Sequence, residues 1–209
     1  MKDILKKAIF LIIKFWSYIY SPLLSKKISL LLSLFYTFWL SREFKSIGKN
    51  AHIAYPIYLK GGKYIEIGDG FASLERLRLE CWDTFGDDKF TPNLTIGSNV
   101  IMNYNVHIGC IEKVSIGNNV LFASNIFITD HQHGYADKRD IGIAPMKRSL
   151  NSKGPVIIED NVWIGENVAI MPRVTIGANS IIGANSVITK DVPVNSVVAG
   201  IPGKIIKML

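Results

Sequence analysis

Residues 158–194 read IEDNVWIGENVAIMPRVTIGANSIIGANSVITKDVPV, with an aliphatic residue at every sixth position. The recurring residues are Ile158, Ile164, Ile170, Ile176, Ile182, Ile188 and Val194. A period of six fits neither an amphipathic helix nor a simple alternating strand. It is typical of a coil of short flat strands joined by tight corners, in which one aliphatic side chain per step points inward. The stretch therefore predicts a repeat rod that acts as a scaffold.

The same period runs through the preceding chain in three shorter runs, from Ile47 to Ile65, from Ile96 to Ile108 and from Ile116 to Ile128. Two segments interrupt it. Residues 71–95 are irregular, and residues 131–155 mix histidines, glycines and prolines with scattered charges. Long loops in compact domains are often functional, and a rigid scaffold is a good support for them. We expect residues 131–155 to leave the rod and to carry chemistry.

Charge divides the chain into two regions. Residues 1–60 hold ten Lys or Arg residues and two Asp or Glu residues. Residues 61–209 hold fourteen Lys or Arg residues and fifteen Asp or Glu residues. A basic chain can indicate a nucleic-acid partner. Here the basic residues near the N-terminus alternate with aliphatic and aromatic ones, which is typical of a lipid surface instead. We therefore expect no nucleic acid, and we divide the chain into N-terminal helices (1–44) and a repeat domain (45–209).

The N-terminal helices are predicted to lie in a membrane interface. Their longest uncharged stretch, residues 28–41, has fourteen residues, fewer than the roughly twenty that a spanning helix needs. No signal-peptide cleavage site is evident. Apolar faces with Trp, Phe and flanking Lys favour a peripheral position on a membrane surface. Packing against the rod or a partner subunit, and a re-entrant hairpin around Pro22, are the alternatives.

Cys81 and Cys110 are the two cysteines of the chain, and they lie far apart in the sequence. Two cysteines in a chain of 209 residues form no disulfide framework, and no metal-type spacing links them. We expect two reduced thiols.

Several short motifs occur in a fixed order along the rod. They are Thr129-Asp130-His131, Ser152-Lys153-Gly154-Pro155, Asn161-Val162-Trp163-Ile164-Gly165, Gly183-Ala184-Asn185-Ser186, Thr189-Lys190-Asp191-Val192-Pro193 and Ala199-Gly200-Ile201-Pro202. With these motifs, the chain from about Ile47 onward resembles the hexapeptide-repeat acyltransferases, above all the galactoside, maltose and surface-polysaccharide O-acetyltransferases. The resemblance implies an all-β left-handed parallel β-helix, here with an N-terminal α-helical appendage, in a homotrimer with sites at the subunit interfaces.

The resemblance also implies transfer of an acetyl group from acetyl-CoA to a sugar hydroxyl, without a metal. His131 matches the catalytic base of the family. A sugar hydroxyl needs such a base, and imidazole suits the task near neutral pH. The tetrahedral oxyanion needs a preorganised donor, which in the family is a backbone N–H that corresponds to Glu166. No activated serine or cysteine is evident, so we expect direct transfer in a ternary complex.

Further site residues follow from the same resemblance. His133 and Asn105 match positions that contact the acceptor, although Asn105 also suits a coil corner. The residues that match CoA-binding positions are Trp163, Ala184, Thr189, Lys190, Lys204 and Lys207. Lysine pairs with phosphate without the bidentate fork of arginine. The hydrophobic, basic N-terminus favours a lipid-linked glycan acceptor, such as an O-antigen or capsule precursor.

Other functions stay open at this point. An amino-sugar N-acetyltransferase and a xenobiotic acetyltransferase share the expected fold. A zinc enzyme of the γ-carbonic-anhydrase kind would use His107, His131 and His133. Strand rise places His131 about four positions, roughly 13 Å, beyond His107, too far for both to bind one metal within a subunit. A non-catalytic rod is a further alternative. The sequence leaves open the acceptor sugar, the hydroxyl and the length of the acyl chain.

Overall fold

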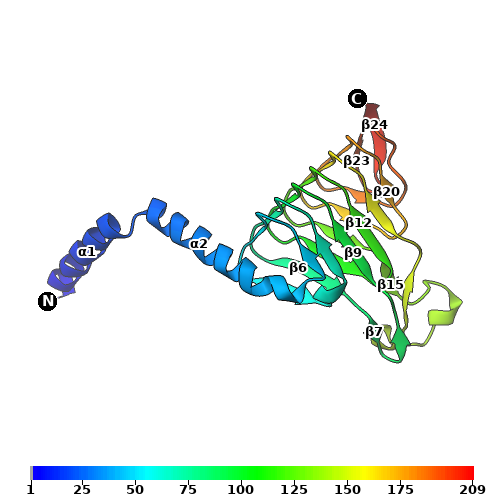
Figure 1. Cartoon of the computed structure of the whole chain (residues 1–209), viewed down its shortest axis with the longest axis horizontal. Helices are drawn as coiled ribbons and strands as arrows, with labels where there is room; N and C mark the ends of the chain where they lie inside the picture. Colours follow the sequence, from blue (N-terminus) through cyan, green and yellow to red (C-terminus); the bar gives the residue numbers. More distant parts are fainter. Residues whose placement is uncertain (1) are drawn as a thin grey trace.

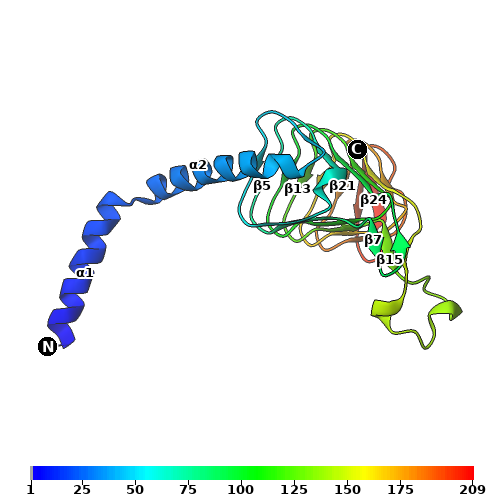
Figure 2. The same ribbon diagram turned by 60° about the horizontal axis from the view of Figure 1, so that its bottom comes forward.

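The computed structural model describes residues 2–209, and it contains a parallel β-helix that follows two N-terminal helices (Figures 1 and 2). Three parallel sheets form the sides of the β-helix. The first sheet contains β1 (Ser46–Ile47), β4 (Ile65–Ile67), β9 (Asn93–Ile96), β12 (Lys113–Ile116), β17 (Val156–Ile158) and β20 (Thr175–Ile176). The second contains β2 (His52–Ile53), β5 (Ala72–Ser73), β10 (Ile101–Met102), β13 (Leu121–Phe122), β18 (Trp163–Ile164), β21 (Ile181–Ile182), β23 (Ser196–Ala199) and the antiparallel β24 (Lys204–Met208). The third contains β3 (Ile57–Lys60), β6 (Leu77–Cys81), β11 (His107–Cys110), β14 (Phe127–Thr129), β19 (Ala169–Ile170) and β22 (Val187–Ile188).

Aliphatic side chains from successive coils stack in columns inside the β-helix. Ile116 pairs in register with Ile158, and Ile158 with Ile176, and all three are buried. Every coil must also turn sharply between sheets. Asparagine occupies many of these corners with a positive φ, a conformation that it tolerates better than most residues. Side-chain amides of neighbouring coils then bond to each other, as in the 3.1 Å bond from Asn161 Nδ2 to Asn179 Oδ1. One short strand and the corner that follows it together take six residues, which explains the period of the sequence.

Two details of the expected repeat are wrong. Val194 is half exposed, whereas Val192 is buried and pairs with Ile176. The last coil is therefore two residues shorter, and the loss lies between Ile188, which still pairs with Ile170, and Val192. Residues 71–81 are also more regular than expected, since they supply β5 and β6 and complete a normal coil. The interruption in this region is confined to the residues that follow β6.

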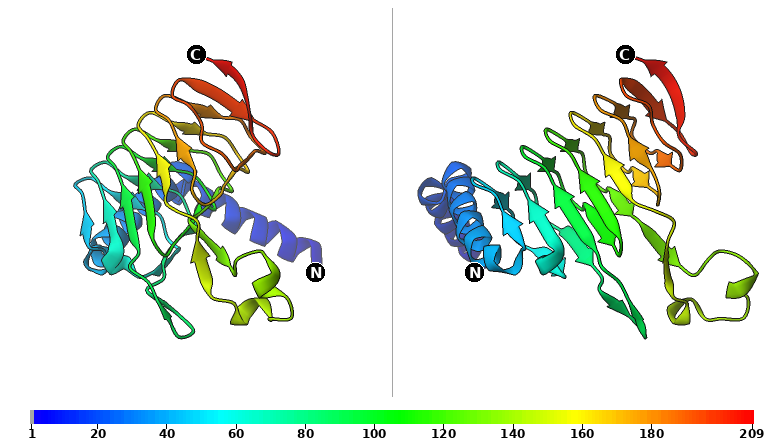
Figure 3. Two further views of the ribbon diagram at one scale, coloured as in Figure 1. Left: turned by 90° about the vertical axis from the view of Figure 1, so that its right-hand side faces the viewer. Right: turned by 45° about the vertical axis from the view of Figure 1, so that its right-hand side comes forward.

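Two excursions leave the β-helix after strands of the third sheet. The first, residues 82–92, contains the hairpin of β7 (Thr84–Phe85) and β8 (Asp88–Lys89). The second, residues 130–155, contains β15 (His131–His133), the short 3-10 helices η3 (Lys138–Asp140) and η4 (Pro145–Lys147), and β16 (Leu150–Ser152). They project from the same edge of the β-helix (Figure 3). The rings of Phe85 and His133 make an edge-to-face contact between them, with 5.2 Å between centroids.

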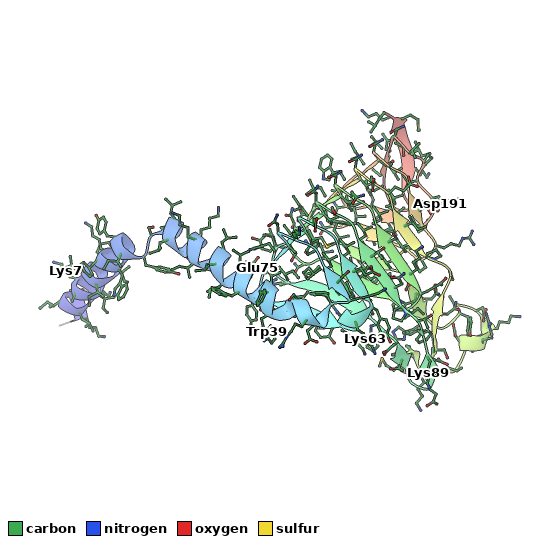
Figure 4. The ribbon with its side chains drawn as sticks, in the orientation of Figure 1. Lys7, Trp39, Lys63, Glu75, Lys89 and Asp191 are labelled. Carbon is green, nitrogen blue, oxygen red and sulfur yellow. The ribbon has the colours of Figure 1, made fainter. Side chains whose placement is uncertain are left out.

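The helices α1 (Lys2–Ile19) and α2 (Pro22–Leu40), here called the N-terminal arm, extend away from the β-helix. Ser21 caps α2, since its Oγ accepts from the Leu24 N–H at 3.2 Å. No residue of α1 is buried, and the labelled side chains of Lys7 and Trp39 stand out from the arm (Figure 4).

Only the C-terminal part of α2 touches the β-helix. Its buried residues are Ser33, Thr37 and Leu40. The Thr37 hydroxyl accepts from the Ile53 N–H at 2.8 Å and donates to the Ser33 carbonyl at 2.7 Å. This part of α2 therefore covers the open end of the first coil, an edge that would otherwise offer unpaired backbone groups. A short 3-10 turn, η1 (Ser41–Glu43), joins α2 to β1.

By length and composition, Pro22–Glu43 is the one helical segment within residues 2–209 that could cross a membrane. This segment is longer than the uncharged stretch of residues 28–41 because it includes Lys26 and Lys27.

Candidate active site

A cavity of about 390 Å³ lies over the outward face of the third sheet, beside the two excursions. Its lining residues are Arg78, Glu80, Trp82, Phe85, His107, Gly109, Phe127, Thr129, His131, Gln132, His133, Leu150 and Met171. Strand geometry determines which residues form the floor of the cavity. Successive residues of a strand point to opposite faces, and Leu79, Ile108 and Ile128 point into the core. Their immediate neighbours along each strand must therefore face outward, where the repeat places no demand on residue type.

His131 lies over the floor because the chain folds back after Asp130. Strand β15 pairs with β16 in antiparallel fashion, with His131 opposite Ser152. The imidazole lies against Gly109, where an added Cβ would come within 3.2 Å of His131 Cε1. The estimate of roughly 13 Å between His107 and His131 assumed a straight strand and does not include this change of direction. Both line one cavity, but residues 2–209 contain no group of three side chains placed to hold a metal.

Asp130 orients the His131 ring. Its Oδ1 lies 2.8 Å from His131 Nδ1, and the carboxylate is fully buried. The backbone N–H groups of Glu112 and Lys113 donate to its Oδ2, each at 2.8 Å. Burial alone would raise the pKa of Asp130, but the hydrogen bonds from His131 and from the backbone N–H groups of Glu112 and Ile111 outweigh it and lower the pKa. The ionised carboxylate thus holds a proton on Nδ1, and Nε2 is left as the basic nitrogen.

No role was predicted for Asp130, although it belongs to the motif Thr129-Asp130-His131. The available signal was an acidic residue directly before the histidine in a segment that leaves the repeat. The bend at Asp130, and the antiparallel pairing of β15 with β16 that follows it, lie outside the six-residue period.

A second carboxylate lies on the floor of the same cavity and was not expected. Glu80 on β6 is only 4% exposed, and it contacts Arg78 and His107. Burial would raise the pKa of Glu80, but the Arg78 guanidinium and His107 lower it below its usual value. Burial also lowers the pKa of His107. Alternating charges on a strand whose other face is aliphatic were the signal for this cluster.

Of the other residues predicted to contact the acceptor or the oxyanion, one lines the cavity and two do not. His133 lines the cavity beside Phe85. Asn105 occupies a corner with φ 58°, and its Nδ2 donates to Asn125 Oδ1 at 2.8 Å. Glu166 lies at the corner between β18 and β19. Neither Asn105 nor Glu166 lines the cavity of its own chain, so their predicted roles require a neighbouring chain.

A second, basic cavity of about 460 Å³ is lined by Lys153, Pro172, Arg173, Thr189, Lys190 and Asp191. It lies in the half of the β-helix remote from the arm, as the label of Asp191 shows (Figure 4). Three cations face one carboxylate there, and Asp191 Oδ1 already accepts from the Thr175 N–H at 2.8 Å. Thr189 and Lys190 were predicted for CoA, whereas no role was predicted for Lys153 and Arg173. Both come next to this cavity only because the coils stack.

The other residues predicted for CoA lie elsewhere on the surface. Trp163 is half exposed on the second sheet, and Ala184 lies at an exposed corner. Lys204 and Lys207 are exposed on β24. None of the four lines either cavity.

The outward face of the second sheet carries an apolar column. Ile101 pairs in register with Leu121, and Leu121 with Trp163, and all three side chains are between 42% and 50% exposed. Ile181 and Val197 continue the column on the next strands. We call these five residues the apolar column. A contiguous exposed apolar strip on a sheet is typical of a surface that another protein covers.

Comparisons with known proteins agree on one family. The family model described as bacterial transferase hexapeptide (six repeats) matches residues 155–190. The chain is 42% identical over 159 residues to the protein named "Putative lipopolysaccharide biosynthesis O-acetyl transferase WbbJ" of Escherichia coli (strain K12), covering 74% of this chain and 77% of that one. It is 33% identical over 169 residues to a galactoside O-acetyltransferase of the same organism, covering 78% of this chain and 64% of the other.

Two solved structures share the architecture. A maltose O-acetyltransferase from Clostridium difficile 630 superimposes with a TM-score of 0.56 at 31% identity, over 81% of this chain and 72% of that one. The N-acyltransferase AntD from Bacillus cereus superimposes with a TM-score of 0.68 at 21% identity, over 83% and 88% of the two chains, which shows the same fold.

Proposed function

The chain belongs to the hexapeptide-repeat acetyltransferases of the left-handed β-helix fold, and we propose that it transfers an acetyl group from acetyl-CoA to a hydroxyl of a surface-polysaccharide sugar. The observation that carries this proposal is the Asp130–His131 pair, with a distance of 2.8 Å between carboxylate and imidazole, beside a cavity of about 390 Å³. The likeness to a lipopolysaccharide O-acetyl transferase over three quarters of the chain supports the class of acceptor.

The geometry assigns a task to each residue. Acetyl-CoA supplies the acyl group as a thioester. His131 Nε2 removes the proton of the attacking hydroxyl, and Asp130 stabilises the imidazolium that forms. The backbone N–H of Glu166 from a neighbouring chain would donate to the developing oxyanion. When the thioester bond breaks, His131 returns the proton to the departing thiolate, so the base is restored after one turnover.

The basic cavity fits the phosphates of CoA. Lys153, Arg173 and Lys190 bring three positive charges to one surface, and charge-assisted bonds to phosphate are the strong ones. Thr189 adds a hydroxyl. In this proposal Trp163 and Ala184 contact the pantetheine arm, and Lys204 and Lys207 contact the terminal phosphates from the last strand.

We propose that a second copy of this chain covers the apolar column, and that three copies form a closed trimer. Glu166 and Asn105 support the assembly, because neither reaches the cavity of its own chain. Light scattering with mass determination should give a trimer, and activity should fall on dilution below the assembly constant. Leu121→Glu should yield monomers without acetyl transfer. An active monomer would contradict this arrangement.

We propose further that the arm binds the inner face of the bacterial inner membrane and brings the enzyme to a lipid-linked glycan. Phe10, Trp16 and Phe35 expose about two thirds of their surface each, beside lysines that suit anionic headgroups. The part of α2 free of the β-helix, residues 22–32, spans about 16 Å. The hydrocarbon core is about 30 Å thick, so α2 cannot cross it while Ser33, Thr37 and Leu40 stay docked.

An acceptor screen tests the activity. The full-length protein is incubated with acetyl-CoA and a panel of soluble and undecaprenyl-linked sugars, and products are read by mass spectrometry. We expect a mass increase of one acetyl group on a hydroxyl that is sensitive to mild alkali. An alkali-stable product on an amino sugar would overturn O-acetylation, and the absence of transfer to every sugar would overturn the function.

A further inference from the structure

The charged cluster on the cavity floor is built around one buried carboxylate. Glu80 Oε1 accepts from Arg78 Nε at 2.8 Å and lies 2.7 Å from Arg78 Nη2 in an ion pair. Glu80 Oε2 lies 3.3 Å from His107 Nε2 and 3.4 Å from Trp82 Nε1. Both oxygens are thus occupied by the protein itself. Glu80 therefore positions its neighbours and leaves little capacity to bind a ligand directly.

The groups that remain available belong to Arg78 and His107. The Arg78 side chain is about half exposed, and Glu80 is the one carboxylate within residues 2–209 that it contacts. Its other N–H groups can donate into the cavity that it lines. His107 donates from Nε2 to Glu80 and is neutral, because burial lowers its pKa. Its Nδ1 has no hydrogen-bond partner in the described chain and can accept a hydrogen bond from a ligand.

The cluster has no net charge. Arg78 and Glu80 cancel, His107 is neutral, and Asp130 is buried among backbone donors and His131. One more cation lies nearby: Lys60 Nζ lies 3.0 Å from the centre of the Trp82 ring, and Lys60 does not line the cavity. Trp82, Phe85 and Phe127 add aromatic walls. A neutral donor–acceptor pair between aromatic rings suits an uncharged sugar ring with free hydroxyls.

We propose that Arg78, Glu80 and His107 form the acceptor subsite beside His131, and that they select an uncharged sugar ring over a uronic acid. One hydroxyl of the ring donates to His107 Nδ1, and another oxygen accepts from Arg78. A ring carboxylate would approach Glu80, and Arg78 is already neutralised by that residue. Like charges in a partly buried site oppose each other strongly. This inference rests on the proposed function and specifies its substrate class.

A charge-swap experiment on the full-length enzyme tests the selection. The substrates are a methyl hexoside and the matching methyl hexuronoside, with acetyl-CoA as donor. The measured quantity is the ratio of kcat/KM for the acid to that for the neutral sugar, in which any loss of folded protein cancels. The natural enzyme should favour the neutral sugar about tenfold or more. Glu80→Gln should raise the ratio about tenfold because it frees Arg78, and Arg78→Gln should lower it.

The matched control removes the same charge from a pair outside the cavity. Glu66 Oε1 lies 2.7 Å from Lys45 Nζ on the exposed face of the first sheet, so Glu66→Gln should leave the ratio unchanged. Calorimetric titration of the two sugars gives a readout without catalysis, and the neutral sugar should bind more tightly. Tighter binding of the acid, or a ratio that Glu80→Gln does not raise, overturns the inference. Selective binding without any transfer supports it and contradicts the proposed function instead.

Discussion

The β-helix and the N-terminal arm use the same kinds of apolar residue in opposite ways. Ile108, Ile128 and Ile170 are completely buried in the β-helix, whereas Phe10 and Trp16 of the arm expose 68% and 59% of their surface. The β-helix therefore buries its apolar side chains within its own core, and this burial stabilises it. The arm does not, and its apolar surface is stabilised only when another surface covers it. This difference supports our proposal that the β-helix carries out the chemistry and that the arm determines where the enzyme is located.

Replacing the base should give the largest effect and should leave the arm untouched. We expect His131→Ala to lower kcat by about two to four orders of magnitude, because no other imidazole in the cavity is held by a buried aspartate in the described chain. CoA binding and partition onto liposomes should not change. The measurement is steady-state kinetics with calorimetry of CoA binding.

His133→Ala is the matched control for this prediction. His133 lines the same cavity but contacts Phe85 instead of a carboxylate, so its loss should reduce turnover far less. A near-normal rate in His131→Ala, or an equal loss in both variants, would contradict the assignment of the base.

Asp130→Asn should have the next largest effect. The amide cannot hold the ring in the same tautomer or stabilise the imidazolium, and we expect kcat to fall about 10- to 1,000-fold with a smaller change in KM. Equal rates for Asp130→Asn and the natural enzyme would show that His131 needs no orientation.

The same variant should change the response of stability to acid. The pKa of Asp130 is lowered in the folded state. Its carboxylate therefore stabilises the fold above the unfolded pKa of about 3.9, and this contribution disappears as the pH falls through the lower folded value. Asp130→Asn should flatten that part of the acid unfolding curve. A curve with unchanged slope below pH 4 would speak against an ionised Asp130.

The sequence predicted the fold of the repeat domain better than it predicted the residues of the candidate site. The six-residue period predicted the repeat domain, because one inward aliphatic residue per step is a demand of the fold itself. The outward positions carry no such demand, so Arg78 and Glu80 gave no periodic signal. His131 was reached by resemblance. Its orientation by Asp130 depends on the bend after β14 and on backbone donors from Glu112 and Lys113, which meet only in three dimensions.

Shortening the arm should affect membrane binding without affecting the chemistry, and its effect on activity should be smaller than that of the variants above. Removal of residues 1–28 deletes α1 and six of the lysines while keeping Ser33, Thr37 and Leu40 on the first coil. We expect weaker sedimentation with anionic liposomes and about tenfold lower activity on a lipid-linked acceptor. Activity on a short soluble sugar should stay the same, as should the melting temperature. Unchanged binding to liposomes would contradict the proposed role of the arm in membrane binding.

A longer deletion sharpens the boundary between the two regions. The division of the chain at residue 45 implies that the repeat domain folds without residues 1–43, because the repeat has its own core. The contacts of Thr37 and Leu40 with the first coil show that such a deletion also removes part of the cover of the β-helix. It should lower the free energy of unfolding by about 2–4 kcal/mol. Equal denaturant midpoints for the two deletions would place all of α2 outside the folded unit.

The smallest effect should come from a single methyl group on the cavity floor. Gly109 has an ordinary φ, so its conformation does not require glycine, but an added Cβ would lie 3.2 Å from His131 Cε1. Gly109→Ala should therefore push the imidazole and lower kcat several-fold, because the base must stay within hydrogen-bond reach of its substrate. Gly109→Val, which is larger, should lower it further. Melting temperature and liposome binding should stay constant in the alanine variant, since Gly109 faces away from the core and from the arm. Full activity in the valine variant would mean that His131 does not react from the position it holds over Gly109.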